Sequence, residues 1–116
     1  MKTLIVILAS LLLLSSQSIA AYRITKCQIE SNGEATYKGT CLFLPDTKGS
    51  FSLENPIKNK PLTNDVIMVS VTLVEKGIAE VQGLTVDGIN SRWGEAKRSL
   101  KDKACWEGDD FKVCAW

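Results

Sequence analysis

The four cysteines are the residues of this 116-residue chain with the best-defined chemistry, because the sequence contains no histidine. Without histidine it lacks the commonest general base, the commonest metal ligand and every Ser-His or Cys-His nucleophile pair. Cysteines in such a chain either form disulfides or, as thiolates, act as nucleophiles and zinc ligands. The redox compartment in which the protein matures decides between these two fates.

Residues 1–20 have the layout of a secretory signal peptide. Lys2 precedes an apolar run over 4–14, and the small residues of 18–20 suit cleavage after Ala20. This run is too short to span a bilayer, and no later stretch approaches the roughly 20 apolar residues of a membrane helix. We therefore expect a secreted or periplasmic protein with no transmembrane segment after cleavage. Residues 21–116 should form a single β domain in which all four cysteines are paired.

Charge and composition narrow the classes of function. Removal of Lys2 leaves 13 basic and 13 acidic residues, a net charge of zero. A neutral domain is a poor match to nucleic-acid binding, which depends on many phosphate contacts, so no nucleic-acid partner is expected. With the cysteines oxidised, we predict no catalytic residue, no metal and no cofactor, and hence no enzyme. Hydrolysis by carboxylates alone is the remaining catalytic alternative.

The elements that must position these residues are predicted to be strands. Apolar segments are short, β-branched and alternating, and turn residues separate them, which indicates an all-β fold, a small antiparallel β-sandwich or barrel. A first strand over 22–31 leads through Asn32-Gly33, a type I′ turn signal, into a return strand that ends near Leu44. A short strand at 50–53 and a loop over 54–64 follow. Residues 94–103 are polar and fit either a loop or one or two helical turns.

The centre of the domain is a predicted hairpin over 65–86. A three-residue loop at 75–77, with Gly77 in the left-handed conformation, gathers one apolar face: Ile67, Val69, Val71, Leu73, Ala79 and Val81. Moving the loop by one residue would mix apolar and polar residues on both faces, so the three-residue loop is favoured. Asp87-Gly88 is a second two-residue turn, which returns through Ile89 to about Trp93.

The C-terminal segment predicts one disulfide. A hairpin around Asp109-Asp110 places Cys105 opposite Cys114 in a non-hydrogen-bonded pair, the class that brings two strands closest. The opposite face then carries apolar residues suited to a core: Trp106, Phe111 and Val113.

Cys27–Cys41 follows by elimination. Plain pairing around Asn32-Gly33 would put Cys27 opposite Lys38 and leave Cys41 on the wrong face. A β-bulge at Gly39 would correct the parity. We therefore predict a bulge at Gly39 and a fold stapled by two disulfides.

Several short motifs resemble a pattern found in small exported bacterial proteins of unknown function. The motif N-G-x-x-x-Y-x-G-x-C spans 32–41, G-S-F spans 49–51, and A-C-W and C-A-W occupy 104–106 and 114–116. These are mostly turn, cysteine and core residues. The resemblance therefore implies a fold and a compartment but no activity.

A second similarity is to the periplasmic inhibitors of c-type lysozyme, small β-barrels that insert a Ser-Gly-x-x-Tyr loop and a Tyr-x-x-x-Thr-Lys-Gly segment into the lysozyme cleft. Residues 31–37 have extra residues in the first motif, and 43–49 match the second with Phe in place of Tyr. The resemblance implies four contacts with the acidic cleft of the enzyme: Ser31, Tyr37, Thr47 and Lys48. The alternative is that these residues only form a hairpin flank, a packing contact and a turn.

The segment 92–103 offers another candidate site. It holds five basic residues against two acidic ones, and Trp93 lies beside Arg92. Such a set would hold an anionic partner, such as a cell-wall or lipopolysaccharide group, through Arg92, Trp93, Lys97 and Arg98. The alternative is a solvated loop of mixed charge.

Together these observations favour an exported, non-enzymatic binding protein of the bacterial envelope or medium. The expected partner is a protein such as a muramidase, so that the chain would inhibit a wall-degrading enzyme such as lysozyme. Two alternatives stay open: a structural or stress-related envelope protein without a dedicated site, and a carboxylate-based hydrolase.

Overall fold

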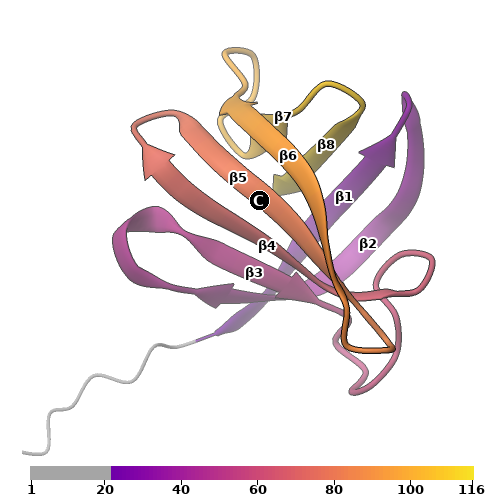
Figure 1. Cartoon of the computed structure of the whole chain (residues 1–116). Coiled ribbons are helices and arrows are strands. Elements are labelled where there is room, and N and C mark those ends of the chain that lie inside the picture. The colour runs from indigo at the N-terminus through magenta and orange to yellow at the C-terminus, as the bar shows by residue number, and fades with distance from the viewer. Residues whose placement is uncertain (1–21) are drawn as a thin grey trace, which may run out of the picture.

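The structure, a computed structural model, describes residues 22–116, and the predicted signal peptide lies outside this range. These residues form a closed antiparallel barrel of eight strands, in which each strand pairs with the next and β8 returns to β1 (Figure 1). The strands are β1 (Arg23–Ser31), β2 (Glu34–Pro45), β3 (Phe51–Glu54), β4 (Val66–Glu75), β5 (Ile78–Thr85), β6 (Asn90–Arg98), β7 (Cys105–Glu107) and β8 (Phe111–Ala115). The predicted all-β fold is confirmed, as a barrel.

Apolar side chains fill the interior of the barrel. Alternation along each strand turns one set of residues inward and the other toward solvent, as expected for a sheet with one buried face. The fully buried side chains come from six different strands: Cys27, Ile29, Cys41, Leu53, Val69, Val71, Val81 and Val113. An eight-stranded barrel is just wide enough for side chains of this kind to fill it.

The predicted register of the central hairpin is confirmed from Leu73–Ala79 outward. The predicted three-residue loop was wrong, because Glu75 pairs with Ile78 and Val74 is the extra residue of a bulge. β4 and β5 pair Val71 with Val81, and Gly77 has a φ of 76°. The predicted core face needs one correction, because the register shifts between Val66 and Met68. This bulge turns Val66 inward, where it is 7% exposed, and removes Ile67 from the core.

Gly77 gives a direct test of this hairpin. A side chain at Gly77 would meet nothing within 4 Å, so the cost of a substitution comes from its positive φ rather than from crowding. Gly77→Val should lower the free energy of unfolding by about 1 kcal/mol or more, because a β-branched residue is strained there. Gly77→Asn should be nearly neutral. Urea denaturation measures both, and a harmless valine would contradict the left-handed turn.

Both predicted disulfides are present, Cys27–Cys41 and Cys105–Cys114. The predicted bulge exists in β2, but its position was wrong. β1 pairs Ile29 with Tyr37 and Glu30 with Ala35, so the extra residue is Thr36 rather than Gly39. The bulge beside the turn shifts the whole strand by one residue, which brings Cys27 and Cys41 to the same face.

The expectation for residues 94–103 was also wrong in part. β6 continues to Arg98, so Lys97 and Arg98 lie on a strand, and only 99–104 form the connection to β7. Ala96 explains the strand, because it is buried inside the barrel opposite Ala79. Burial of one small apolar residue among charged ones holds this polar sequence in the sheet.

The compartment follows from the cysteines. All four are paired, and none is free. Disulfides persist in oxidising surroundings, so the protein belongs in a non-cytoplasmic compartment. Among residues 22–116, no helix has the length and apolar character needed to cross a membrane.

Candidate functional site at the basic end of the barrel

Basic residues collect at one end of the barrel. Alternate connections of an up-and-down barrel lie at the same end, so β2–β3, β4–β5 and β6–β7 share an end with the start of β1 and the end of β8. We call these connections, with the strand residues that flank them, the basic end. It carries six basic residues: Arg23, Lys48, Lys76, Arg98, Lys101 and Lys103. It also carries three acidic residues: Asp46, Glu75 and Asp102.

The opposite end has the reverse character. It consists of the β1–β2, β3–β4, β5–β6 and β7–β8 connections with their flanking strand residues, and we call it the acidic end. It carries seven acidic residues: Glu34, Glu54, Asp65, Asp87, Glu107, Asp109 and Asp110. Only Lys58 and Lys60 are basic there. A domain without net charge is therefore polarised along the barrel, and its field attracts anions at one end.

The residues predicted from the lysozyme-inhibitor resemblance do not come together. Thr47 and Lys48 form the β2–β3 turn at the basic end, whereas Ser31 ends β1 at the acidic end. The 12 residues of β2 separate the two sites. At about 3.3 Å per residue this is a path of about 40 Å, so Ser31 and Lys48 cannot enter one cleft together.

The two predicted aromatic residues belong to the wall of the barrel. Tyr37 packs against the core, and its hydroxyl donates to the Thr40 carbonyl. Trp93 sits where the register between β5 and β6 shifts, and it packs edge-on against Phe111 with ring centroids 5.7 Å apart. Both side chains therefore have structural contacts. Neither is presented at the basic end.

Of the four basic-segment candidates, Arg98 flanks the β6–β7 loop at the basic end, Lys97 precedes it on β6, and Arg92 lies away from this end. The Arg92 guanidinium lies 3.0 Å from a Glu80 carboxylate oxygen on the neighbouring strand. The Arg92 guanidinium is therefore already paired with the Glu80 carboxylate. The useful part of the predicted segment is its second half, at Lys97, Arg98 and the loop that follows them.

The β2–β3 turn presents Lys48 in a fixed geometry. The Asp46 carboxylate accepts the Thr47 N–H at 2.7 Å, and the Ser50 N–H donates to the Thr47 carbonyl at 3.1 Å. Lys48 adopts a φ of 55° between them and is exposed. The turn therefore holds the Lys48 side chain outward from the end of the barrel.

The β6–β7 loop is also held by hydrogen bonds. Ser99 is buried, and its hydroxyl accepts the N–H groups of Lys101 and Asp102 at 3.1 and 3.3 Å. The Asp102 carboxylate accepts the Ala104 N–H and the Trp116 indole N–H, each at 3.0 Å. These bonds fasten the loop to the last residue of the chain.

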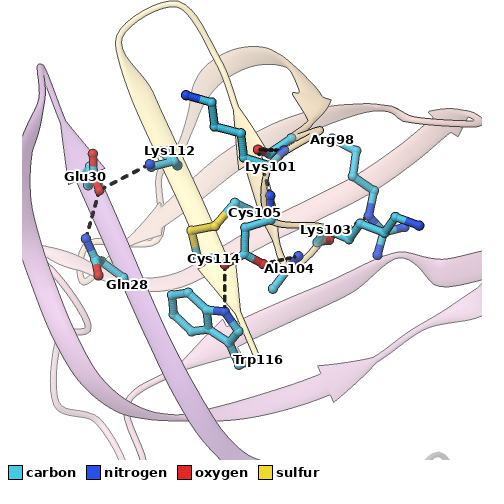
Figure 2. The surroundings of a disulfide bond; sticks show 12 residues. Gln28, Glu30, Arg98, Lys101, Lys103, Ala104, Cys105, Lys112, Cys114 and Trp116 are labelled. Atoms are coloured by element: carbon cyan, nitrogen blue, oxygen red, sulfur yellow. Dashed lines mark hydrogen bonds and ion pairs between the residues drawn. A yellow bond between two sulfur atoms is a disulfide. The ribbon is translucent and has the colours of Figure 1, made fainter.

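A disulfide braces the same region from the outside of the barrel. Trp106 and Val113 point inward, so their neighbours Cys105 and Cys114 lie on the outer face, and both are buried. Figure 2 shows Lys101, Lys103 and Trp116 around this bridge, with the Arg98 side chain bonded to the Lys103 carbonyl at 2.8 Å. The bridge and the hydrogen bonds together hold the loop backbone that carries the basic side chains.

Two cation–π contacts are formed at the basic end. The Arg98 guanidinium lies 5.2 Å from the centre of the Trp106 ring, and the Arg23 guanidinium lies 4.5 Å from that of Phe43. Such contacts hold a guanidinium over an aromatic face while leaving its charge available. Near the Trp116 ring, a hollow of about 560 Å³ is lined in part by Lys26 and Lys38.

The acidic end has a pocket of its own, of about 320 Å³. Trp93 and Phe111 supply its aromatic lining, and the Thr36 and Thr63 hydroxyls bond each other at 2.8 Å within it. Its charged lining residues are three acidic ones, Glu30, Asp65 and Asp110, and one basic one, Arg92, so it does not favour an anion. Within residues 22–116, no group of three or more Asp, Glu or Cys side chains is arranged to hold a metal ion.

Sequence reasoning missed the separation of charge. The signal was available, because successive connections of a meander lie at opposite ends, so the charges of the two sets of connections could have been counted separately. Comparison with protein-family models, with curated proteins and with solved structures finds no match for this chain.

Proposed function

We propose that this chain is an exported, secreted or periplasmic binding protein, without enzymatic activity, that holds an anionic partner at the basic end of its barrel. The observation that carries the proposal is the gathering of six basic residues at one end of a domain whose net charge is zero. A predicted signal peptide and two disulfides support the exported state.

The ion pairs support the same assignment. Within the described part of the chain, the two ion pairs are Arg92–Glu80 and Lys112–Glu30. Neither uses a basic residue of the basic end. Cations without a carboxylate partner give up no ion pair when an anion binds, and charge-assisted hydrogen bonds to an anion are the strong class.

Polyphosphate of defined length is a suitable first probe, because it offers anionic charge without other features. Lys101→Gln with Lys103→Gln should weaken binding and lower the slope of log affinity against log salt by about one per lysine. Lys58→Gln with Lys60→Gln is the matched control, because it removes the same charge from the acidic end. Fluorescence anisotropy across a salt series measures both, and equal losses in the two variants would refute the proposal.

A second candidate function is inhibition of a c-type lysozyme through the β2–β3 turn alone. The observation in its favour is the fixed, exposed Lys48 in a segment similar to the second inhibitor motif. A lysozyme cleft works through two carboxylates, which a lysine can engage by charge-assisted hydrogen bonds.

The corresponding experiment compares three variants in a lysozyme assay. Lys48→Ala should weaken inhibition about ten-fold or more, since a hydrogen bond to a charged group contributes about 1.5–3 kcal/mol. Lys76→Ala, in the neighbouring β4–β5 turn, and Ser31→Ala, at the other end, should have little effect. No inhibition by the unaltered protein at large molar excess over several c-type lysozymes would exclude this candidate.

A further inference from the structure

We propose that the anionic partner of the basic end is the surface of a lipid bilayer, and that Leu100 enters the headgroup region at the point of contact. This inference rests on the proposed function, because it names the partner of the same site. Its evidence is the set of apolar side chains that the basic end exposes among its charges.

Leu100 is the clearest of these side chains. It lies in the β6–β7 loop and is 100% exposed, although Leu is a residue type that usually lies inside a protein. Arg98 precedes it, and Lys101 and Lys103 follow. An apolar residue surrounded by cations is the arrangement that interfacial segments use to bind anionic membranes.

The exposure of Leu100 is built into the loop. The buried Ser99 hydroxyl accepts the Lys101 and Asp102 N–H groups, so the loop has a defined turn with Leu100 at its outside. The Ser99 N–H also donates to the Cys105 carbonyl at 2.9 Å. A loop already held in this shape loses little conformational freedom when it binds, which favours association.

Other apolar side chains surround the same end. Ile24 and Val74 are each 57% exposed, and Trp116 is 46% exposed. They come from β1, β4 and the C-terminus, so they lie around the rim and not in one patch. Tryptophan is enriched at membrane interfaces, where its ring is apolar and its N–H is polar.

This dispersed arrangement favours a lipid surface over a protein partner. Protein interfaces concentrate their binding energy in a few clustered anchors that fill pockets. The basic end instead alternates single apolar side chains with cations around a rim. Each Lys or Arg near an anionic leaflet adds attraction that falls off within a Debye length, so six such residues on one end suit a charged plane.

The test uses vesicles of phosphatidylcholine with and without 30 mol% phosphatidylglycerol and the oxidised protein. Co-sedimentation should show binding to the anionic vesicles that weakens with salt, and about ten-fold less binding for Leu100→Ser. Ile57→Ser is the matched control, because Ile57 is 61% exposed but lies in the β3–β4 loop at the acidic end. Unchanged thermal unfolding of both variants confirms that they fold.

The outcomes separate this inference from the function on which it rests. Polyphosphate binding that needs Lys101 and Lys103, without vesicle binding, would overturn the lipid assignment and leave the proposed function in place. If the protein binds neither polyphosphate nor anionic vesicles, both the lipid assignment and the proposed function are excluded. Vesicle binding that is unchanged by Leu100→Ser would overturn the insertion of Leu100. Equal binding to neutral vesicles would overturn the anionic bilayer as the partner.

Discussion

Replacing Cys27 and Cys41 together by alanine should lower the free energy of unfolding by about 3–4 kcal/mol, a large share of the stability of a small domain. The bridge joins residues 14 apart in sequence, and removing such a crosslink costs about 3 kcal/mol in the unfolded-state model. Both residues also belong to the packed core, where they are 2% and 0% exposed. Loss of two buried sulfur atoms leaves a cavity, which adds to the cost.

The outer bridge provides the control. Cys105 and Cys114 are 9 residues apart, so their crosslink should contribute a similar amount through the unfolded chain. They do not belong to the core cluster, and their replacement by alanine opens no cavity inside the barrel. Urea denaturation of both double variants should therefore show the larger loss for Cys27 and Cys41. The reverse order would contradict the placement of the two bridges.

Gly108→Ala is expected to have the second large effect, a loss of about 2 kcal/mol or more. A Cβ atom at Gly108 would overlap the ring of Phe111, which is 9% exposed and packs against Trp93. The ring packs in the core and against Trp93, so moving it gives up these contacts, and overpacking of this kind costs about 1–3 kcal/mol.

Gly39→Ala is the matched control for this substitution. A Cβ atom at Gly39 would make an ordinary contact of 3.5 Å with the Tyr37 hydroxyl oxygen. Its stability should change by well under 1 kcal/mol, because neither crowding nor strain opposes the methyl group. Thermal unfolding measures both glycine variants, and equal stabilities would show that Phe111 can leave its place without cost.

The sequence predicted those parts of the fold that depend on local alternation. The pairing of Val71 with Val81 followed from sorting apolar residues to one face, and the pairing of Cys105 with Cys114 followed from counting outward from a turn. The type I′ turn followed from Asn32-Gly33, whose φ values of 52° and 85° are both positive. Each of these depends on residues close together in the chain.

The bulges could not be placed in this way. Thr36, Ile67 and Trp93 each stand where one strand has an extra residue. A bulge forms where the barrel must bend or where one side chain fits the interior better than its neighbour, and both conditions depend on strands distant in sequence. The prediction of a bulge was correct for β2, but Gly39 was chosen on residue type alone.

The candidate site was missed for a related reason. The net charge of a chain does not show how its charges are distributed in space. A short motif likewise does not show at which end of a barrel its residues lie. Ser31 and Lys48 were grouped by similarity to a family, yet one strand of 12 residues carries them to opposite ends. Leu100 lies among charged residues, so only its exposure in the structure distinguishes it from a residue that points inward.

The closure of the barrel has a consequence for the order of folding. β1 completes its pairing only with β8, as in Cys27 opposite Ala115, and β8 is the last strand to leave the ribosome. The Cys27–Cys41 bridge joins β1 to β2 and can form while the sheet is still open, whereas the Cys105–Cys114 bridge requires β8. Until β8 arrives, β1 has an unpaired edge of the kind that recruits foreign strands. Truncation before β8 should therefore yield an aggregating chain in which Cys27–Cys41 is formed and Cys105 has lost its partner.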